Sequence, residues 1–73
     1  MRKFLIIIEK TKSGFSAYSP DLEGFIATGA TKRAVKRSMR DAIIFHLKGL
    51  KQDGLKIPSR KSYSTYLEVS AHS

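Results

Sequence analysis

Five cations fall within the nine positions from Lys32 to Arg40, where a helix is expected to begin. They are Lys32, Arg33, Lys36, Arg37 and Arg40. At about 100° per residue these side chains share one arc of a helix, with two later lysines. Such a cluster can hold phosphate groups, although the arc carries no aromatic side chain that could stack on a base. A solvated helix face explains the same pattern, and its position at the positive end of the helix dipole costs up to about 1 kcal/mol per cation.

Acidic and nucleophilic residues form no catalytic pattern in this sequence. Asp21 and Glu23, in the stretch PDLEG, are the main acidic feature of the first half, and Asp21 equally suits a turn. A two-metal nuclease site needs several converging carboxylates, and six acids spread over the chain do not supply them. No phosphate-binding glycine loop or nucleophile elbow occurs. We therefore expect no catalytic residue, no metal and no cofactor.

Two apolar residues and a histidine stand out on the expected helix. Ile44 and Phe45 fall outside its core stripe, so each is expected to contact something other than the sheet. That contact is either a second copy of the chain or a different protein. His46 lies at the apolar edge with no acid or nucleophile nearby in the sequence, which favours a packed residue over a catalyst.

Five elements are expected to position these residues. Strands are predicted at Lys3–Glu9, Phe15–Ser19 and Phe25–Gly29, separated by the turn-forming stretches KTKSG and PDLEG. Thr31 is a plausible N-cap for a helix that runs from Lys32 to about Lys51 and ends at QDG. A fourth strand is predicted at Tyr63–Val69. The fold class is α+β, with the order β-β-β-α-β and one helix packed on a small sheet.

The first strand is apolar on both of its faces. Phe4, Ile6 and Ile8 point one way, and Leu5 and Ile7 point the other. The single helix, with its stripe of apolar residues at helical spacing, can cover only one face of the sheet. We therefore expect self-association to a dimer or tetramer.

Composition restricts the class of protein further. The chain has 73 residues, room for a single domain at 1–70 with a short tail at 71–73. Its net charge is +8, and ten of its fourteen cations lie between residues 32 and 61, which favours an anionic partner. There is no cysteine, hence no disulfide or thiolate metal site, and no apolar run long enough to span a membrane. A cytoplasmic location without membrane contact is expected.

Three stretches, in this order, resemble the HicB antitoxin family, particularly its short forms without a C-terminal DNA-binding domain. They are FSAYSPDLEGFIATGATK (Phe15–Lys32), AIIFHLKGL (Ala42–Leu50) and LKIPSRKSYSTYLEV (Leu55–Val69). Together they cover nearly the whole chain. The resemblance implies a truncated RNase-H-like fold, which agrees with the predicted order of elements.

The resemblance also implies a function. A HicB-like chain would neutralise a HicA-like toxin, an enzyme that cleaves mRNA, in a type II toxin–antitoxin system. We expect it to cover the RNA-binding site of the toxin with a surface that includes Asp21, Glu23, Ile44 and Phe45. The alternative is a stand-alone oligomeric module that binds nucleic acid through Lys32, Arg33, Lys36, Arg37 and Arg40.

Overall fold

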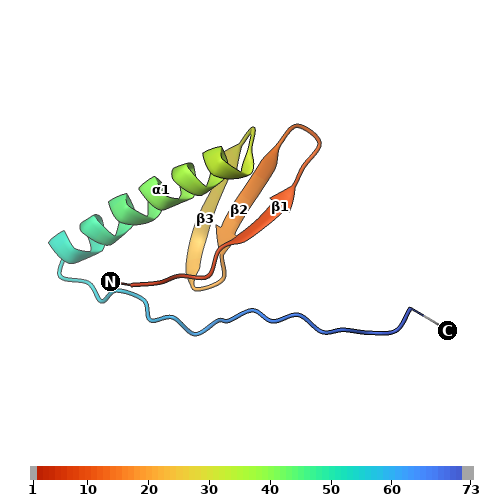
Figure 1. The fold of residues 1–73 in the computed structure, drawn as a ribbon. Coiled ribbons are helices and arrows are strands. Elements are labelled where there is room, and N and C mark those ends of the chain that lie inside the picture. The colour runs from red at the N-terminus through yellow and green to blue at the C-terminus, as the bar shows by residue number, and fades with distance from the viewer. Residues whose placement is uncertain (1, 72–73) are drawn as a thin grey trace.

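A three-stranded antiparallel sheet and one helix make up the regular part of the chain. The computed structural model describes residues 2–71. Strands β1 (Ile7–Lys10), β2 (Phe15–Ser19) and β3 (Leu22–Gly29) lie side by side in the order β1-β2-β3, and helix α1 (Lys32–Gln52) follows. Figure 1 shows α1 lying across one face of the sheet, as a second layer. The α+β class and the helix-on-sheet arrangement agree with the prediction.

The pairing of the strands gives the sheet two different faces. Ile8, Ala17 and Ala27 are opposite one another and form a row on the face that α1 covers. The neighbouring row consists of Ile7, Tyr18 and Ile26 and points to the other face, because successive residues of a strand alternate. Ile26 is 78% exposed. The second face is therefore an uncovered apolar row across all three strands.

The hairpin between β2 and β3 is tighter than the sequence indicated. Ser19 pairs directly with Leu22, which leaves only Pro20 and Asp21 in the turn. The strand register shifts just after this turn, and Gly24 has a positive φ of 81°, which glycine adopts without steric cost. The predicted loop PDLEG is thus half strand, and it places Leu22 in the core.

The core lies between α1 and the covered face of the sheet. Five buried side chains form it: Ala17, Leu22, Val35, Met39 and Ile43. Phe4, Ile6 and Ile8 pack against this cluster, which confirms their predicted common direction. The core is small, so each of these contacts is a large share of the stability of the domain.

Both ends of α1 are capped. The hydroxyl oxygen Oγ1 of Thr31 accepts a hydrogen bond of 3.0 Å from the N–H of Ala34, which confirms the predicted N-cap. At the other end Gly54 has φ 70°, and the N–H of Leu55 donates to the carbonyl of Leu50 at 2.8 Å. This pattern is a Schellman motif and explains why α1 ends at Gln52.

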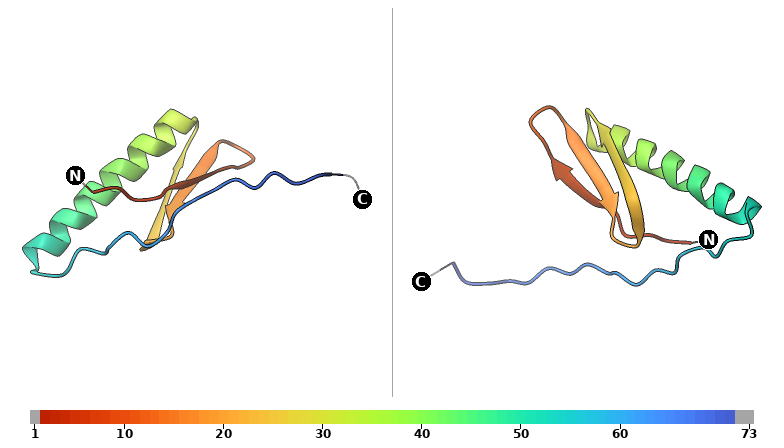
Figure 2. Two further views of the ribbon diagram at one scale, coloured as in Figure 1. Left: turned by 60° about the horizontal axis from the view of Figure 1, so that its bottom comes forward. Right: turned by 180° about the vertical axis from the view of Figure 1, so that it is seen from behind.

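The predicted fourth strand is wrong for the isolated chain. Residues 55–71 have no regular secondary structure, and residues 63–69 form no hydrogen bond with the sheet in the described part of the chain. Figure 1 shows this segment passing below the β2–β3 turn and running on beyond the sheet, and Figure 2 shows its end extending away from the strands. The alternating pattern of Tyr63–Val69 is real, but a strand also needs an edge to pair with. The predicted tail, residues 71–73, lies outside the described residues beyond Ala71.

One buried polar atom is unpaired within residues 2–71. Ser19 is almost fully buried, and its hydroxyl oxygen Oγ has no hydrogen-bond partner there.

Because an unsatisfied buried hydroxyl costs about 1–3 kcal/mol, we expect Ser19→Ala to raise the free energy of unfolding by about 1 kcal/mol. Chemical denaturation followed by circular dichroism measures this change. Ser16→Ala, on the same strand, is the control and should stay within about 0.5 kcal/mol of the parent. A clear loss of stability in Ser19→Ala would contradict the assignment.

Candidate interaction surface

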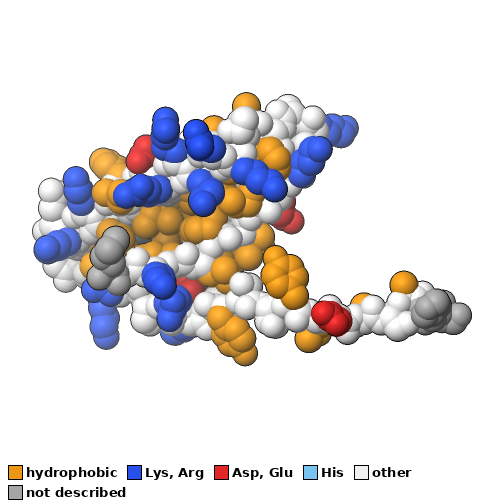
Figure 3. Space-filling model, in the orientation of Figure 1, with side chains coloured by type: hydrophobic (Ala, Val, Ile, Leu, Met, Phe, Trp, Pro, Cys, Tyr) orange, Lys and Arg blue, Asp and Glu red, His pale blue; other side chains and the backbone are white. Residues whose placement is uncertain are grey.

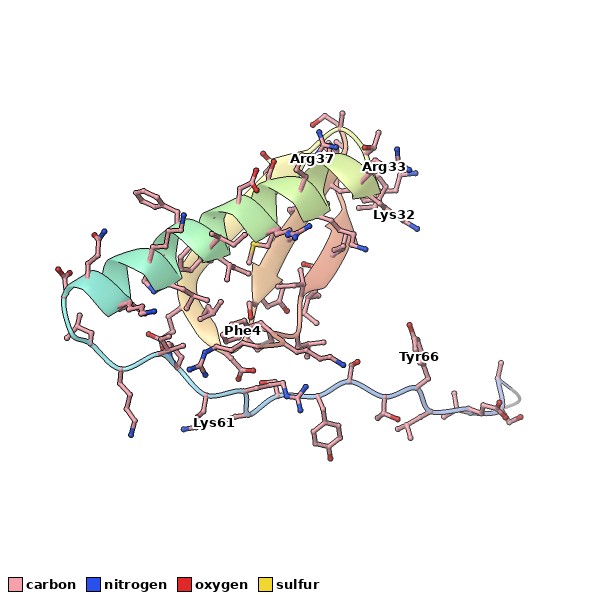
Figure 4. All side chains as sticks on the ribbon, turned by 60° about the vertical axis from the view of Figure 1, so that its left-hand side comes forward. Phe4, Lys32, Arg33, Arg37, Lys61 and Tyr66 are labelled. Atoms are coloured by element: carbon pink, nitrogen blue, oxygen red, sulfur yellow. The ribbon has the colours of Figure 1, made fainter. Side chains whose placement is uncertain are left out.

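The cations of α1 form one exposed face. Lys32, Arg33, Lys36, Arg37 and Arg40 are all solvent-exposed, and no ion pair joins them to an acid within residues 2–71. The first turn of the helix has no acidic residue that could offset its dipole. Figure 3 shows the row of blue side chains along the helix, and Figure 4 shows Lys32 and Arg33 pointing outward at its beginning. The structure thus brings together all five residues of the predicted basic cluster.

Ile44 and Phe45 lie on different sides of the helix. Ile44 is four residues from both Arg40 and Lys48, so it sits within the basic face and is 43% exposed. Phe45 is turned about 100° away from it and is 80% exposed. Their adjacency in the sequence had predicted a common contact surface for the two side chains. Of the aromatic side chains on the sheet and helix, Phe45 is the most exposed.

The two acids of the predicted loop have different surroundings. The carboxylate of Asp21 accepts hydrogen bonds from the backbone N–H of Ser62 at 3.2 Å and from the Ser62 hydroxyl at 3.0 Å. We call this contact the Asp21–Ser62 clasp. Glu23 is exposed at the beginning of β3. Of the pair, therefore, Glu23 is available to a partner, while Asp21 holds the segment that follows the helix.

The clasp sets the ionisation of Asp21. Desolvation opposes the charged form, but hydrogen bonds from Ser62, a further one from the Lys61 backbone, and the nearby Lys61 charge favour it. Their combined effect lowers the pKa of Asp21 below its ordinary value. The carboxylate is thus charged, and the clasp closed, at neutral pH.

His46 is a packing residue in this fold. Its ring meets that of Phe25 edge to face, with 4.6 Å between the centroids. This contact agrees with the interpretation from the sequence. It also packs the third quarter of α1 against the first half of β3.

A second basic region was not visible in the sequence. The extended residues 2–5 and 58–64 border two adjoining hollows of about 440 and 560 Å³, which share Lys3, Phe4 and Arg60. We call them together the cationic groove, because four cations and no acid line it. The four are Arg2, Lys3, Arg60 and Lys61. Two pairs of cations almost sixty residues apart gave no sequence signal, since only the fold brings them together.

Residues 2–71 contain neither a metal-binding cluster nor a membrane-spanning helix. No group of three or more His, Cys, Asp or Glu side chains is placed to hold a metal ion. No helix in this part of the chain combines the length and the apolar character needed to cross a membrane.

Comparison with known proteins finds one distant relative. No protein-family profile matches the chain, and no solved structure matches it. A protein of Haemophilus phage HP1 (strain HP1c1), described as an uncharacterized 14.9 kDa protein in the rep-hol intergenic region, is 29% identical over 62 residues. The match covers 85% of this chain and 47% of the phage protein. The chain thus spans about half the length of this relative, whose description states no activity.

The lowered pKa of Asp21 makes the clasp sensitive to acid. Because the pKa is lower in the folded than in the unfolded chain, the clasp contributes stability above the ordinary aspartate value of about 3.9 and loses it as the pH falls through the folded pKa. We expect the amide proton shift of Ser62 to titrate with a midpoint below about 3.9. NMR spectra across an acid pH series measure it.

Two controls belong to this titration. In Asp21→Asn the Ser62 shift should no longer titrate, since the carboxylate is gone. The amide of Ser64, two residues further on and without a carboxylate partner, should not move in the parent chain. A Ser62 midpoint at or above the ordinary aspartate value would show that the clasp does not favour the charged form.

Proposed function

We propose that this chain is a non-enzymatic, antitoxin-like protein that neutralises a HicA-type, mRNA-cleaving toxin by covering its RNA-binding site. The observation that carries the proposal is the exposure of Phe45 in the second half of α1. Large aromatic side chains are frequent among the few residues that anchor protein interfaces, and an exposed one on a rigid helix is suited to that role.

The fold and the charges near Phe45 support the same function. The order β1-β2-β3-α1 corresponds to the first four elements that the resemblance to HicB antitoxins implies. Glu23, exposed near the start of β3, provides an acidic group that a basic, RNA-binding toxin can contact. In this arrangement Phe45 supplies affinity and Glu23 supplies orientation.

The mechanism needs no chemical step. An RNA-binding toxin presents cations to the phosphate backbone of its substrate, and a protein that occupies this surface excludes the RNA by steric overlap. The net charge of +8 opposes the approach of a basic toxin. The contact is therefore expected to centre on Phe45, in the second half of α1 and away from the cations of its first turns.

Growth rescue tests this function. HicA-type toxins are induced one at a time from one promoter while this chain is expressed from another, and growth and mRNA cleavage are measured. We expect the parent chain to restore growth against at least one toxin. Phe45→Ala should weaken the complex at least 30-fold in a binding titration, as expected for loss of a central aromatic anchor.

The matched control reverses the charge of Arg33, Lys36, Arg37 and Arg40. This variant should neutralise the toxin as well as the parent chain does, or better, because the like-charge repulsion is reduced. Rescue that survives Phe45→Ala but fails in the charge-reversed variant would place the contact on the basic face and refute the proposed surface.

A second candidate function rests on the five unpaired cations at the start of α1. A stand-alone nucleic-acid-binding module would use them to hold phosphates without reading sequence, since no base-stacking aromatic accompanies them. Binding of a random duplex should then weaken with salt, with a log–log slope near −0.9 for each phosphate contacted. The charge-reversed variant should lose this binding, and Phe45→Ala should keep it.

A further inference from the structure

The C-terminal arm, residues 63–71, exposes large apolar side chains to solvent. Tyr66 is 98% and Leu67 is 83% exposed, and Tyr63 and Val69 are exposed to a similar degree. The backbone of residues 63–69 makes no hydrogen bond with the rest of residues 2–71. Figure 4 shows Tyr66 projecting from the arm with no other side chain around it. Yet the stretch is rich in residues that favour strands, and it alternates as a strand does.

The beginning of the arm is nevertheless fixed. The Asp21–Ser62 clasp ties the residue just before the arm to the turn between β2 and β3. The arm thus leaves the molecule from a defined point, and the longest dimension of the chain reaches 54 Å. Figures 1 and 2 show it running past the sheet in every view. An extended, anchored segment of this kind is prepared to pair with another molecule.

The cationic groove lies beside the point where the arm begins. It is bordered by residues 2–5, which lead into the edge strand β1, and by residues 58–64, the last two of which are the first residues of the arm. An edge strand presents unpaired N–H and C=O groups, and the extended residues before β1 continue that edge. Phe4 and Leu5 add apolar surface to the groove.

The distribution of charge favours the arm of a second copy as the segment that occupies the cationic groove. Residues 62–73 contain one acid, Glu68, and no cation, so all fourteen cations of the chain lie on the body. The bodies of two copies, which hold the whole excess of positive charge, repel each other, while the arm carries no cation and is not repelled in this way. Glu68 lies in the middle of the arm, where it can meet the cations that line the groove.

We propose that the arm of one copy adds as a strand in the cationic groove of a second copy, and that the exchange is reciprocal. Two identical molecules can do this around a two-fold axis, which closes the assembly as a dimer and leaves no free arm. The arm gains backbone hydrogen bonds along the edge of β1, and its apolar side chains leave water. This explains why Tyr63–Val69 has a strand sequence but no strand partner within its own chain. The inference is independent of the proposed function.

The first test measures the mass of the full-length chain in solution. Sedimentation equilibrium over a concentration series should give a dimer for the parent chain. Tyr66→Ser/Leu67→Ser should raise the dimer dissociation constant at least 100-fold, because two large apolar side chains lose their burial. Both residues are exposed in the protomer, so its fold does not depend on them. Circular dichroism checks this directly.

Two further variants separate the arm from other surfaces. Glu68→Lys should weaken the dimer, since it places a cation among four others. Phe45→Ser removes an equally exposed apolar side chain from α1 and should leave the dimer intact. A monomeric parent chain, or a dimer that survives Tyr66→Ser/Leu67→Ser, would overturn the proposal.

Disulfide trapping distinguishes exchange between copies from return of the arm to its own groove. The chain has no cysteine, so every disulfide must come from introduced residues. Leu5→Cys in a tagged chain, mixed with Leu67→Cys in an untagged chain, should give a mixed disulfide-linked dimer on oxidation. Phe45→Cys mixed with Leu67→Cys is the control and should give little. If a chain carrying both Leu5→Cys and Leu67→Cys forms only an internal disulfide, the arm belongs to its own groove and the exchange is refuted.

Discussion

The close approach of α1 to the end of β3 is the constraint on which the rest of the structure depends. At Gly29, a Cβ atom would lie 2.6 Å from the backbone nitrogen of Val35, so no larger residue fits there without moving the helix. This contact lays the first turns of α1 directly on the sheet and buries Val35 and Met39 completely. The direction of the helix follows from it. So does the outward turn of the basic face.

The single helix covers one face of the sheet and leaves two apolar surfaces of the molecule exposed. One face of the sheet is closed by α1, and the other presents Ile7, Tyr18 and Ile26 in a row. The arm adds a second uncovered apolar surface, separated from the sheet. Both are far from the densest positive charge on the helix. These uncovered apolar surfaces are thus separate from the basic cluster at the beginning of α1.

Residue patterns predicted the local structure well and the long-range structure poorly. Thr31, the stripe of Val35, Met39 and Ile43, and the QDG terminus define α1 to within a residue, because caps and helical spacing are local properties. Leu22 was missed, since PDLEG has the composition of a loop and the tight turn that draws it into β3 depends on pairing with Ser19. The clasp between Asp21 and Ser62 and the cationic groove depend on contacts between distant segments, which no spacing in one sequence reveals. The prediction of a fourth strand was wrong for a related reason. Alternation shows that a segment can form a strand, but it does not show which strand the segment would pair with.

The order of contacts along the chain has a consequence for how the molecule forms. β1 pairs with β2, β2 with β3, and α1 packs mainly on β3, so the main contacts join elements that are neighbours in the sequence. Chains with such local contacts fold quickly, because little loop entropy is lost before each contact is made. The core can thus form without the arm, since no residue of the arm belongs to it. A strand that pairs with the arm would then belong to a body that is already folded.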